Sequence, residues 1–259
     1  MSILEHNTSE IANFFWHGTL TNFEKSCIKS FVRHGWIVQL WSYTGLHVDG
    51  AIQKDAREVL PEDHLFKYNQ HGLVVDNDEA HTTLAAFSDV FRYHLLEQER
   101  GWWFDCDCFC LKNVKEYAKL KDSLGLIVGV MYPEPRFGIG TGALYLNKEL
   151  AQTMIDIVNN SGAKCDNQFG KWAEIGPELV ENVLVETGDI SKALPLNVFY
   201  AIHWDEFDLL VKPENISIAL RRTKNSLMIH AWDTVIKLRG YDKNDLPSGS
   251  FLDHLCKVI

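Results

Sequence analysis

The sequence predicts a three-layer α/β fold, in which helices cover the two faces of a central sheet. Short runs rich in aromatic and β-branched residues alternate with longer segments in which apolar residues recur every three or four positions. The chain has 259 residues, of which 46% are hydrophobic and 23% charged, so it can bury a sizeable core. We find neither an internal repeat nor a linker in it. We therefore expect residues 1–259 to form a single domain.

The first quarter of the chain predicts a strand, a helix and a second strand. Residues 11–16 form a short apolar run, and residues 23–34 carry apolar side chains at helical spacing. Residues 36–43 are rich in the aromatic and β-branched side chains that favour strands. A further helix is expected over residues 52–60, where Pro61 would end it.

The next segment predicts a long helix followed by a strand with an acidic end. Residues 80–99 place leucine and phenylalanine side chains on one helical face, and Gly101 follows as a stop signal. Residues 102–110 begin as an apolar strand and become acidic at Asp105 and Asp107. The remaining expected strands are residues 124–132, 143–147, 193–200 and 226–232, and the remaining expected helices are residues 148–159 and 168–186.

Composition and charge argue against several classes of protein. The chain has 25 Lys and Arg against 35 Asp and Glu, and its net charge of -10 opposes binding to nucleic acid or to an anionic bilayer. Its first residues lack the pattern of a secretory signal, and no apolar run reaches the roughly 18 residues of a membrane span. We therefore expect a cytoplasmic protein with reduced thiols and no nucleic-acid partner, and any membrane contact would be peripheral.

Two Asp-x-Asp triplets occur, and only one has the context of a ligand site. Residues 76–78 lie in a polar stretch with no strand before them, which favours solvated surface. Residues 105–107 end an apolar strand, and side-chain alternation would place Asp105 and Asp107 on the same side. Two such carboxylates repel each other unless a cation neutralises them, and Mg²⁺ or Mn²⁺ prefers such oxygen ligands. A hydrated acidic turn is the alternative.

Three cysteines alternate through the same strand. Cys106, Cys108 and Cys110 could form a site for a soft metal, but zinc sites usually combine cysteines two to four residues apart with a second ligand cluster. Alternation would also turn Cys106 and Cys108 away from the acidic pair. The pattern favours small buried hydrophobic side chains.

The helix and the acidic strand together resemble the signature of a known family. Residues 88–96 (SDVFRYHLL) and 101–107 (GWWFDCD) are similar to the S-D-x-x-R-Y-x-x-L and G-G-x-Y-x-D-x-D segments of the glycosyltransferase sugar-binding DXD family. This family includes yeast mannosyltransferases, animal α1,4-galactosyltransferases and bacterial capsular and lipopolysaccharide enzymes, and large clostridial toxins share the motif. The resemblance extends, less densely, to residues 14–18, 138–147, 175–177, 196–200 and 229–232. Three positions depart from the family pattern: His17, Arg100 and Trp103.

The resemblance implies a GT-A (Rossmann-like) nucleotide-sugar-binding fold with a central mixed, mostly parallel sheet. Residues 1–135 would mainly bind the donor, and residues 136–259 would mainly bind the acceptor and complete a metal site. Asp107, assisted by Asp105, would hold Mn²⁺ or Mg²⁺ against the donor diphosphate. His230 is the expected third protein ligand, and a core histidine bonded to a carbonyl group is the alternative.

The resemblance also implies residues that bind the donor. Asp89 and Arg92 would contact the hydroxyl groups of the donor sugar, with Ser88 beside them. Without the family pattern, Asp89 and Arg92 would be interpreted as an intrahelical ion pair worth roughly 0.2–0.5 kcal/mol. Trp16 would stack on the nucleobase, and an ordinary core tryptophan is the alternative.

The acceptor side is the least defined part of the sequence. Asp166, Asn167 and Gln168 could approach the anomeric carbon, although a helix cap is the favoured interpretation. We find no clear nucleophile and favour a mechanism in which a donor phosphate oxygen helps to deprotonate the acceptor. Possible sugar platforms, which are more simply core residues, are Trp172, Trp204 and Trp232.

We therefore expect a metal-dependent, retaining glycosyltransferase that moves a hexose or N-acetylhexosamine, most simply from a UDP-sugar, to a glycan or lipid-linked acceptor. The resemblance favours bacterial surface polysaccharide or lipooligosaccharide synthesis at the inner face of the cytoplasmic membrane. One alternative is a phosphohydrolase of the haloacid dehalogenase type, although that class would place Thr or Val where Phe109 stands. The other is a sugar-nucleotide-binding module without turnover.

Overall fold

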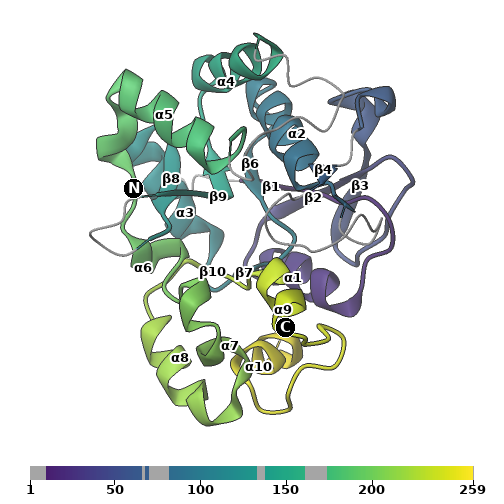
Figure 1. Cartoon of the computed structure of the whole chain (residues 1–259), viewed down its shortest axis with the longest axis vertical. Coiled ribbons are helices and arrows are strands. Elements are labelled where there is room, and N and C mark those ends of the chain that lie inside the picture. The colour runs from purple at the N-terminus through teal and green to yellow at the C-terminus, as the bar shows by residue number, and fades with distance from the viewer. Residues whose placement is uncertain (1–9, 66–67, 70–81, 133–137, 161–173, 259) are drawn as a thin grey trace, which may run out of the picture.

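The computed structural model describes residues 10–65, 68–69, 82–132, 138–160 and 174–258, and its centre is a six-stranded sheet (Figure 1). The strand order is β3-β2-β1-β6-β9-β8; the first four strands are parallel neighbours, and β9 pairs antiparallel with both β6 and β8. The predicted mixed, mostly parallel sheet is therefore confirmed. The strands are β1 (Ile11–Phe15), β2 (Ile37–Ser42), β3 (Ala51–Asp55), β6 (Trp102–Phe104), β8 (Ile127–Val130) and β9 (Ile139–Tyr145).

Helices cover both faces of this sheet, as the three-layer prediction requires. Successive side chains of a strand point to opposite faces, so Phe14 and Phe15 of β1 enter two different hydrophobic clusters. The Phe14 cluster includes side chains of α1 (Asn22–Arg33) and α3 (Val114–Leu124). The Phe15 cluster includes side chains of α2 (Ala85–Glu97), α4 (Lys148–Asn160) and α5 (Pro177–Thr187). These three layers are those expected of a GT-A fold.

The helix that follows β1 begins where the sequence places a strong start signal. Thr21 caps α1 by accepting a hydrogen bond from the backbone N–H of Phe23, and the carboxylate of Glu24 accepts one from the Thr21 N–H. This reciprocal capping satisfies donors that the first helical turn would otherwise leave unpaired. It also fixes Glu24 at the carboxyl end of β1, next to the site described below.

Two predicted elements have a different type of secondary structure in the structure. The helix expected over residues 52–60 is instead the edge strand β3 followed by a 3₁₀ turn, Ala56–Glu58, which the Asp55 side chain caps. The strand expected over residues 193–200 is the short helix α6 (Leu196–Phe199). Phe199 and Tyr200 are buried under glycines of β8 and β9, so tertiary packing decides the conformation of this apolar segment.

The acidic strand expected over residues 102–110 is interrupted. β6 ends at Phe104, the chain turns at residues 105–107, and β7 (Cys108–Cys110) begins a second sheet by pairing antiparallel with β10 (Met228–His230). The Cys108 N–H donates to the Asp105 carbonyl at 3.1 Å, which closes the turn. The alternation argument for Asp105 and Asp107 is therefore wrong, because these residues lie in a turn and not in a continuous strand.

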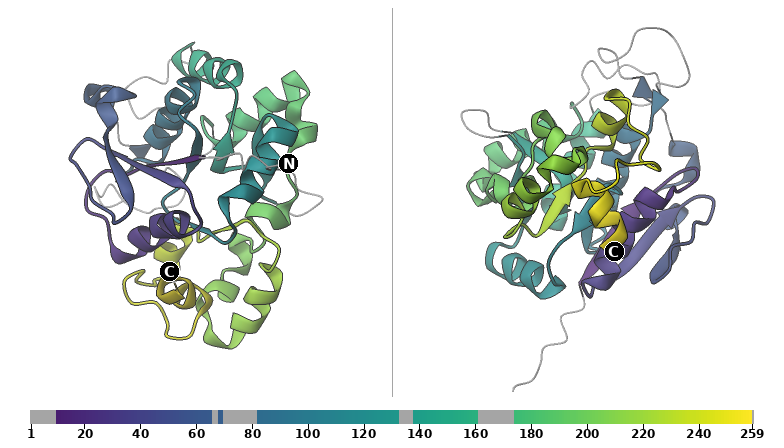
Figure 2. Two further views of the ribbon diagram at one scale, coloured as in Figure 1. Left: turned by 180° about the vertical axis from the view of Figure 1, so that it is seen from behind. Right: turned by 90° about the horizontal axis from the view of Figure 1, so that it is seen from below.

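The last third of the chain is more helical than expected. The helices expected at residues 148–159 and 168–186 correspond to α4 and α5, and residues 168–173 lie outside the described residues. Short helices gather beside β10 and β7. They lie at the bottom of Figure 1 and at the bottom of the left view of Figure 2, which shows the molecule from behind. They are α7 (Asp208–Val211), α8 (Ile216–Arg222), α9 (Asp233–Leu238) and α10 (Phe251–Val258).

The remaining described elements are small. They are the pair β4 (Tyr68–Asn69) and β5 (Thr82–Thr83), and the 3₁₀ turns Glu62–His64, Asp189–Lys192, Trp204–Glu206 and Pro213–Asn215. Within the described part of the chain, no helix is both long enough and apolar enough to cross a bilayer.

Candidate active site and metal centre

The turn after β6 and the end of β10 bring two carboxylates and an imidazole together. His230 Nε2 lies 3.3 Å from Asp107 Oδ1 and 3.7 Å from Asp105 Oδ2. Asp105 and Asp107 follow the carboxyl end of a strand of the main sheet, where ligands bind in open α/β sheets. The structure therefore places the three predicted metal ligands in one cluster, although His230 is more than a hundred residues from the two aspartates along the chain.

Backbone groups hold Asp107 on the side of β10. Its Oδ2 accepts the N–H of Asp233 at 2.9 Å, at the start of α9, and its carbonyl accepts the N–H of Ala231 at 2.9 Å. Oδ1 is the oxygen that faces His230. Asp107 is thus oriented by backbone N–H groups. Substituting the side chains of Ala231 or Asp233 would leave these N–H groups in place.

Gly142 of β9 makes room for this cluster. A Cβ atom at this position would lie 2.6 Å from His230 Cδ2, 3.0 Å from its Nε2 and 3.4 Å from Asp105 Oδ2. The backbone of β9 also contacts the acidic turn directly, because the Asp105 N–H donates to the Gly142 carbonyl at 2.9 Å. A larger residue at position 142 would displace the imidazole or the carboxylate.

Arg92 of α2 joins the helix to the acidic turn. Its Nη1 lies 3.2 Å from Asp89 Oδ1, and its Nη2 donates to Asp105 Oδ1 at 3.1 Å. Nη1 and Nε donate to the carbonyl groups of Thr141 and Ser88, at 2.7 and 3.3 Å. The guanidinium group also lies 4.9 Å from the centre of the Trp103 ring. The predicted i, i+3 pair thus exists, and it is buried and shared with Asp105.

Asp89 is enclosed by a segment from the last third of the chain. A Cβ atom on Gly176 would lie only 2.6 Å from Asp89 Oδ2, so the backbone before α5 passes directly over this carboxylate. The Tyr93 hydroxyl, one helical turn away, donates to the Ile175 carbonyl at 2.7 Å. These contacts tie α2 to residues 175–176.

Burial and mutual charge shift the pKa values of these groups. Burial raises the pKa of Asp89 to about 6, although Arg92 opposes the change. Burial also raises the pKa of Asp107, and the negative charge of Asp105 adds to the effect despite the opposing influence of His230. Asp105 has a lowered pKa, because its contacts with Arg92 and His230 outweigh burial. The pKa of His230 is raised, because the two carboxylates outweigh burial. Such a cluster is stabilised by an added positive charge.

The donor atoms present are suited to a divalent cation. Asp105 Oδ1 is taken up by Arg92 and by the indole N–H of Trp103 at 2.8 Å, so its Oδ2 is the oxygen that faces His230. Carboxylate oxygens and an imidazole nitrogen together suit Mn²⁺, and carboxylate oxygens suit Mg²⁺. The chemistry of this donor set therefore agrees with the predicted cofactor.

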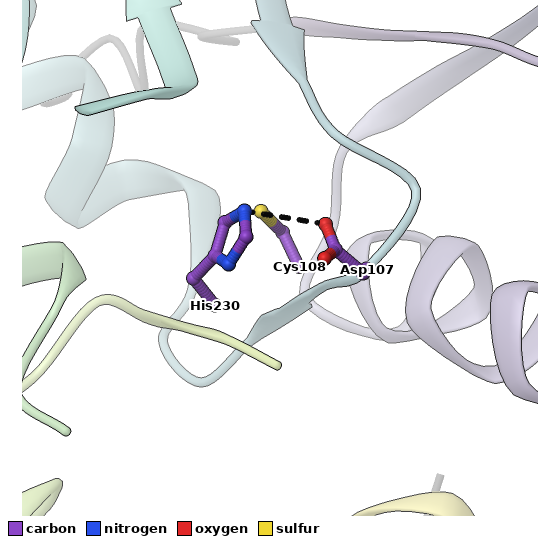
Figure 3. Close-up of side chains that lie close together, drawn as sticks. All are labelled: Asp107, Cys108 and His230. Atoms are coloured by element: carbon purple, nitrogen blue, oxygen red, sulfur yellow. Dashed lines mark ion pairs between the residues drawn. The ribbon is translucent and has the colours of Figure 1, made fainter. Parts of the chain in front are cut away.

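Cys108 also lies in this cluster, although the sequence analysis did not assign it there. Asp107, Cys108 and His230 each offer one ligand atom, and these atoms all lie within 4.8 Å of one another (Figure 3). The expectation that Cys106, Cys108 and Cys110 are buried is confirmed. The expectation that Cys108 points away from the acidic pair is wrong, because the turn at 105–107 breaks the alternation of side chains.

The other predicted site residues are mainly tryptophans, and they differ in burial and in hydrogen-bond partner. Trp16 follows β1, and its indole N–H donates to the Thr19 carbonyl at 3.3 Å. Trp232 is buried, donates to the Ile202 carbonyl at 3.0 Å, and has its ring centre 4.3 Å from that of His230. Trp204 is only partly buried. The other acceptor-side candidates, which lie outside the described residues, are Asp166, Asn167, Gln168 and Trp172.

Sequence reasoning missed a buried charge cluster next to the site. Lys243, whose side chain is 12% exposed, forms ion pairs with Glu24, which is 1% exposed, and with Asp233 Oδ1 at 3.0 Å. Its ammonium group also lies 5.5 Å from the centre of the Trp16 ring. The cluster joins the start of α1 to the start of α9. Lys243 is 219 positions from Glu24 and 10 positions from Asp233 along the chain, so no local sequence pattern could reveal the cluster.

Comparisons with solved structures find glycosyltransferases with low sequence identity. The apo-form glycosyltransferase GlyE of Streptococcus pneumoniae is 13% identical, with a TM-score of 0.48 over 92% of this chain and 61% of that chain. This chain thus spans less than two thirds of the GlyE chain. Mouse xyloside xylosyltransferase 1 is 11% identical, with a TM-score of 0.46 over 88% and 99% of the two chains. Galactosyltransferase LgtC is 10% identical, with a TM-score of 0.42 over 89% and 95%.

No curated protein matches the sequence. A family model described as the alpha 1,4-glycosyltransferase conserved region matches residues 167–257. The matched segment contains Gly176, His230, Asp233 and Lys243, whereas the acidic pair and the α2 residues lie before it. Residues 167–257 thus carry an alpha 1,4-glycosyltransferase conserved region, and this match covers the last part of the chain only.

Proposed function

We propose that this chain is a metal-dependent, retaining glycosyltransferase that moves a hexose or N-acetylhexosamine from a UDP-sugar to a glycan or lipid-linked acceptor. The observation that carries the proposal is the meeting of Asp105, Asp107 and His230 at the carboxyl end of β6, beside the Asp89–Arg92 pair. A diphosphate-bearing donor needs a local positive charge in a chain with a net charge of -10.

Asp107, His230 and Asp105 would hold Mn²⁺ or Mg²⁺. The cation, when bound, supplies positive charge that stabilises the nucleotide diphosphate as it leaves the sugar. Asp107 Oδ2 stays bonded to the Asp233 N–H, which leaves Oδ1 as the ligand atom. The Arg92 contact fixes Asp105 in the same way and leaves its Oδ2 toward His230.

Asp89 and Arg92 would recognise the hydroxyl groups of the donor sugar. Burial raises the Asp89 pKa to about 6, which lies below neutral pH, so the carboxylate form predominates at pH 7 and can accept a hydrogen bond from a sugar hydroxyl group. The three nitrogens of Arg92 each contact a protein oxygen, but a guanidinium carries five N–H groups and so retains capacity for a ligand. Ser88 lies beside them on α2.

Trp16 would provide the surface on which the nucleobase stacks. It directly follows β1 at the same edge of the sheet as the acidic turn, which is where a nucleotide would extend from the diphosphate. Residues 1–135 would accordingly bind most of the donor, and residues 136–259 would bind the acceptor and complete the metal site through His230.

Asp166, Asn167 and Gln168 would contribute to acceptor binding, together with Trp232, whose ring centre lies 4.3 Å from that of His230. We favour deprotonation of the acceptor hydroxyl by a donor phosphate oxygen, because no carboxylate among the described residues other than those already named lies in the cluster with His230. Detection of a covalent glycosyl adduct on the protein would refute this mechanism. The resemblance to capsular and lipopolysaccharide enzymes supports a role in surface-glycan synthesis at the inner face of the bacterial cytoplasmic membrane.

The experiment that tests the function combines thermal shift with nucleotide release. UDP-sugars and GDP-mannose would each be mixed with the protein in the presence of Mn²⁺ or EDTA, using the wild type and Asp107→Asn. A ligand that binds only the folded state raises the unfolding midpoint by mass action. We expect one donor to give metal-dependent stabilisation and release of its nucleotide, both lost in Asp107→Asn. Stabilisation without release in the presence of candidate acceptors would favour a binding module, and no response to any donor would refute the proposal.

A further inference from the structure

We propose that Cys108 is a sulfur ligand of this metal centre, so that the site also binds thiophilic divalent cations such as Zn²⁺ and Co²⁺. The inference rests on the proposed function in one respect, namely that a cation sits between Asp107 and His230. It goes beyond that function because it predicts a mixed oxygen, nitrogen and sulfur site in place of one built from carboxylates and an imidazole.

The pairing of two strands fixes the thiol next to the imidazole. β7 and β10 are antiparallel, and their register places Cys108 directly opposite His230. Directly opposed residues of an antiparallel pair have Cβ atoms about 4.5–5.5 Å apart on the same face of the sheet. Asp107 precedes Cys108 in the chain, and its Oδ1 lies 3.3 Å from His230 Nε2. The three ligand atoms, all within 4.8 Å of one another, come together through this local ladder.

The surroundings of the thiol suit a metal ligand. Cys108 is fully buried, and its Sγ donates to the Gly142 carbonyl at 3.4 Å. Gly142 is also the residue whose missing side chain leaves space beside the imidazole. When a cation binds, the thiol loses its proton to solvent and the thiolate takes up the metal–sulfur bond. The thiolate would then join the Asp107 carboxylate and the His230 imidazole, with Asp105 Oδ2 as the further oxygen that faces His230, which gives a mixed set of oxygen, nitrogen and sulfur ligands.

The neighbouring cysteines are engaged elsewhere and serve as controls. The Cys106 Sγ donates to the Phe15 carbonyl at 3.4 Å. The Cys110 Sγ donates to the Lys112 carbonyl at 3.2 Å and lies 3.4 Å from the Tyr117 hydroxyl. Both side chains are buried like Cys108, so Cys106→Ser is a matched control for the loss of a buried thiol in the same segment.

The test is a Co²⁺ titration of the full chain without donor or acceptor. Sulfur-to-cobalt charge transfer absorbs in the near ultraviolet and appears only if a thiolate binds the ion. We expect this band in the wild type and in Cys106→Ser, and its loss in Cys108→Ser. We also expect the Zn²⁺ affinity of Cys108→Ser to fall by more than about 10-fold, because a direct ligand matters at least as much as its supporting residues.

Two further measurements keep the test decisive. X-ray absorption of the Co²⁺-loaded wild type, which needs no variant, should show one sulfur neighbour even if Cys108→Ser does not fold. Mn²⁺ binding followed by electron paramagnetic resonance separates the two proposals. Wild-type protein that binds Mn²⁺ and Co²⁺ without a sulfur band or sulfur neighbour would refute the inference and leave the proposed function standing. Wild-type protein that binds no divalent cation at all would refute both.

Discussion

Replacing Gly142 with alanine tests whether the space beside His230 is needed for cation binding. The added Cβ would lie 2.6 Å from His230 Cδ2, whereas ordinary van der Waals contact begins at 3.4 Å, so the imidazole must move by about 0.8 Å. A displacement of about 1 Å at reacting groups can cost roughly 100-fold in rate. We therefore expect weaker Mn²⁺ binding and a loss of donor-dependent nucleotide release on the order of 100-fold.

The same substitution should also cost stability, because an extra methyl group in a packed site typically costs roughly 1–3 kcal/mol. Gly129→Ala is a matched control. Its Cβ would lie 2.8 Å from Phe199 and 3.2 Å from Tyr200, in the core and not at His230. We expect urea unfolding to show comparable destabilisation for the two variants, with Mn²⁺ affinity reduced only for Gly142→Ala. Mn²⁺ affinity in Gly142→Ala equal to that of the wild type would show that the imidazole does not bind the cation.

Three other predictions concern the buried charges. Because burial raises the pKa of Asp89 from 3.8 to about 6, the folded state holds this proton more tightly, and the free energy of unfolding falls as the pH rises between these values. Urea unfolding at several pH values should show that Asp89→Asn removes this slope, worth at most about 3 kcal/mol; an unchanged slope would contradict the assignment. Arg92→Met leaves two carboxylates without their buried partner and should destabilise by roughly 3–5 kcal/mol in chemical unfolding, and a cost below about 1 kcal/mol would show that the pair is solvated. Lys243→Met should cost about as much, because Glu24 is 1% exposed, whereas the matched Lys237→Met removes a pair whose lysine is 63% exposed and should cost less than about 1 kcal/mol. Equal effects of the two lysine substitutions would argue against the buried cluster.

Much of the fold was predictable because the relevant signals are local. The strand β1, the helix α1 and the strand β2 each follow from the periodicity of their own side chains. The helix expected over residues 52–60 was wrong because residues 51–55 pair with β2 as an edge strand. The strand expected over residues 193–200 was wrong because Phe199 and Tyr200 pack against glycines of β8 and β9. The helix α3 was not predicted at all.

The candidate site also combines features that the sequence predicted with features that only the tertiary structure revealed. The carboxylates of Asp105 and Asp107 were expected to meet because of strand alternation, but they meet because of a turn. His230 was expected from the resemblance, and the structure brings it to within 3.3 Å of Asp107. Lys243 carried no local signal, because its ion pairs are long-range. For Cys108 the alternation of cysteines raised a soft-metal site, but the sequence favoured a buried hydrophobic role, because the strand register that places the thiol opposite His230 is not written in a local pattern.

The sequence by itself determined the class of fold, the acidic end of the β6 segment and the types of side chain available for a metal. These depend on periodicity and residue chemistry, which act over a few positions of the chain. Only the tertiary structure decided which carboxylate oxygen faces the imidazole and that a thiol shares the site. Those outcomes depend on the β7–β10 register and on the close approach of β9 at Gly142, where separate segments compete for the same space.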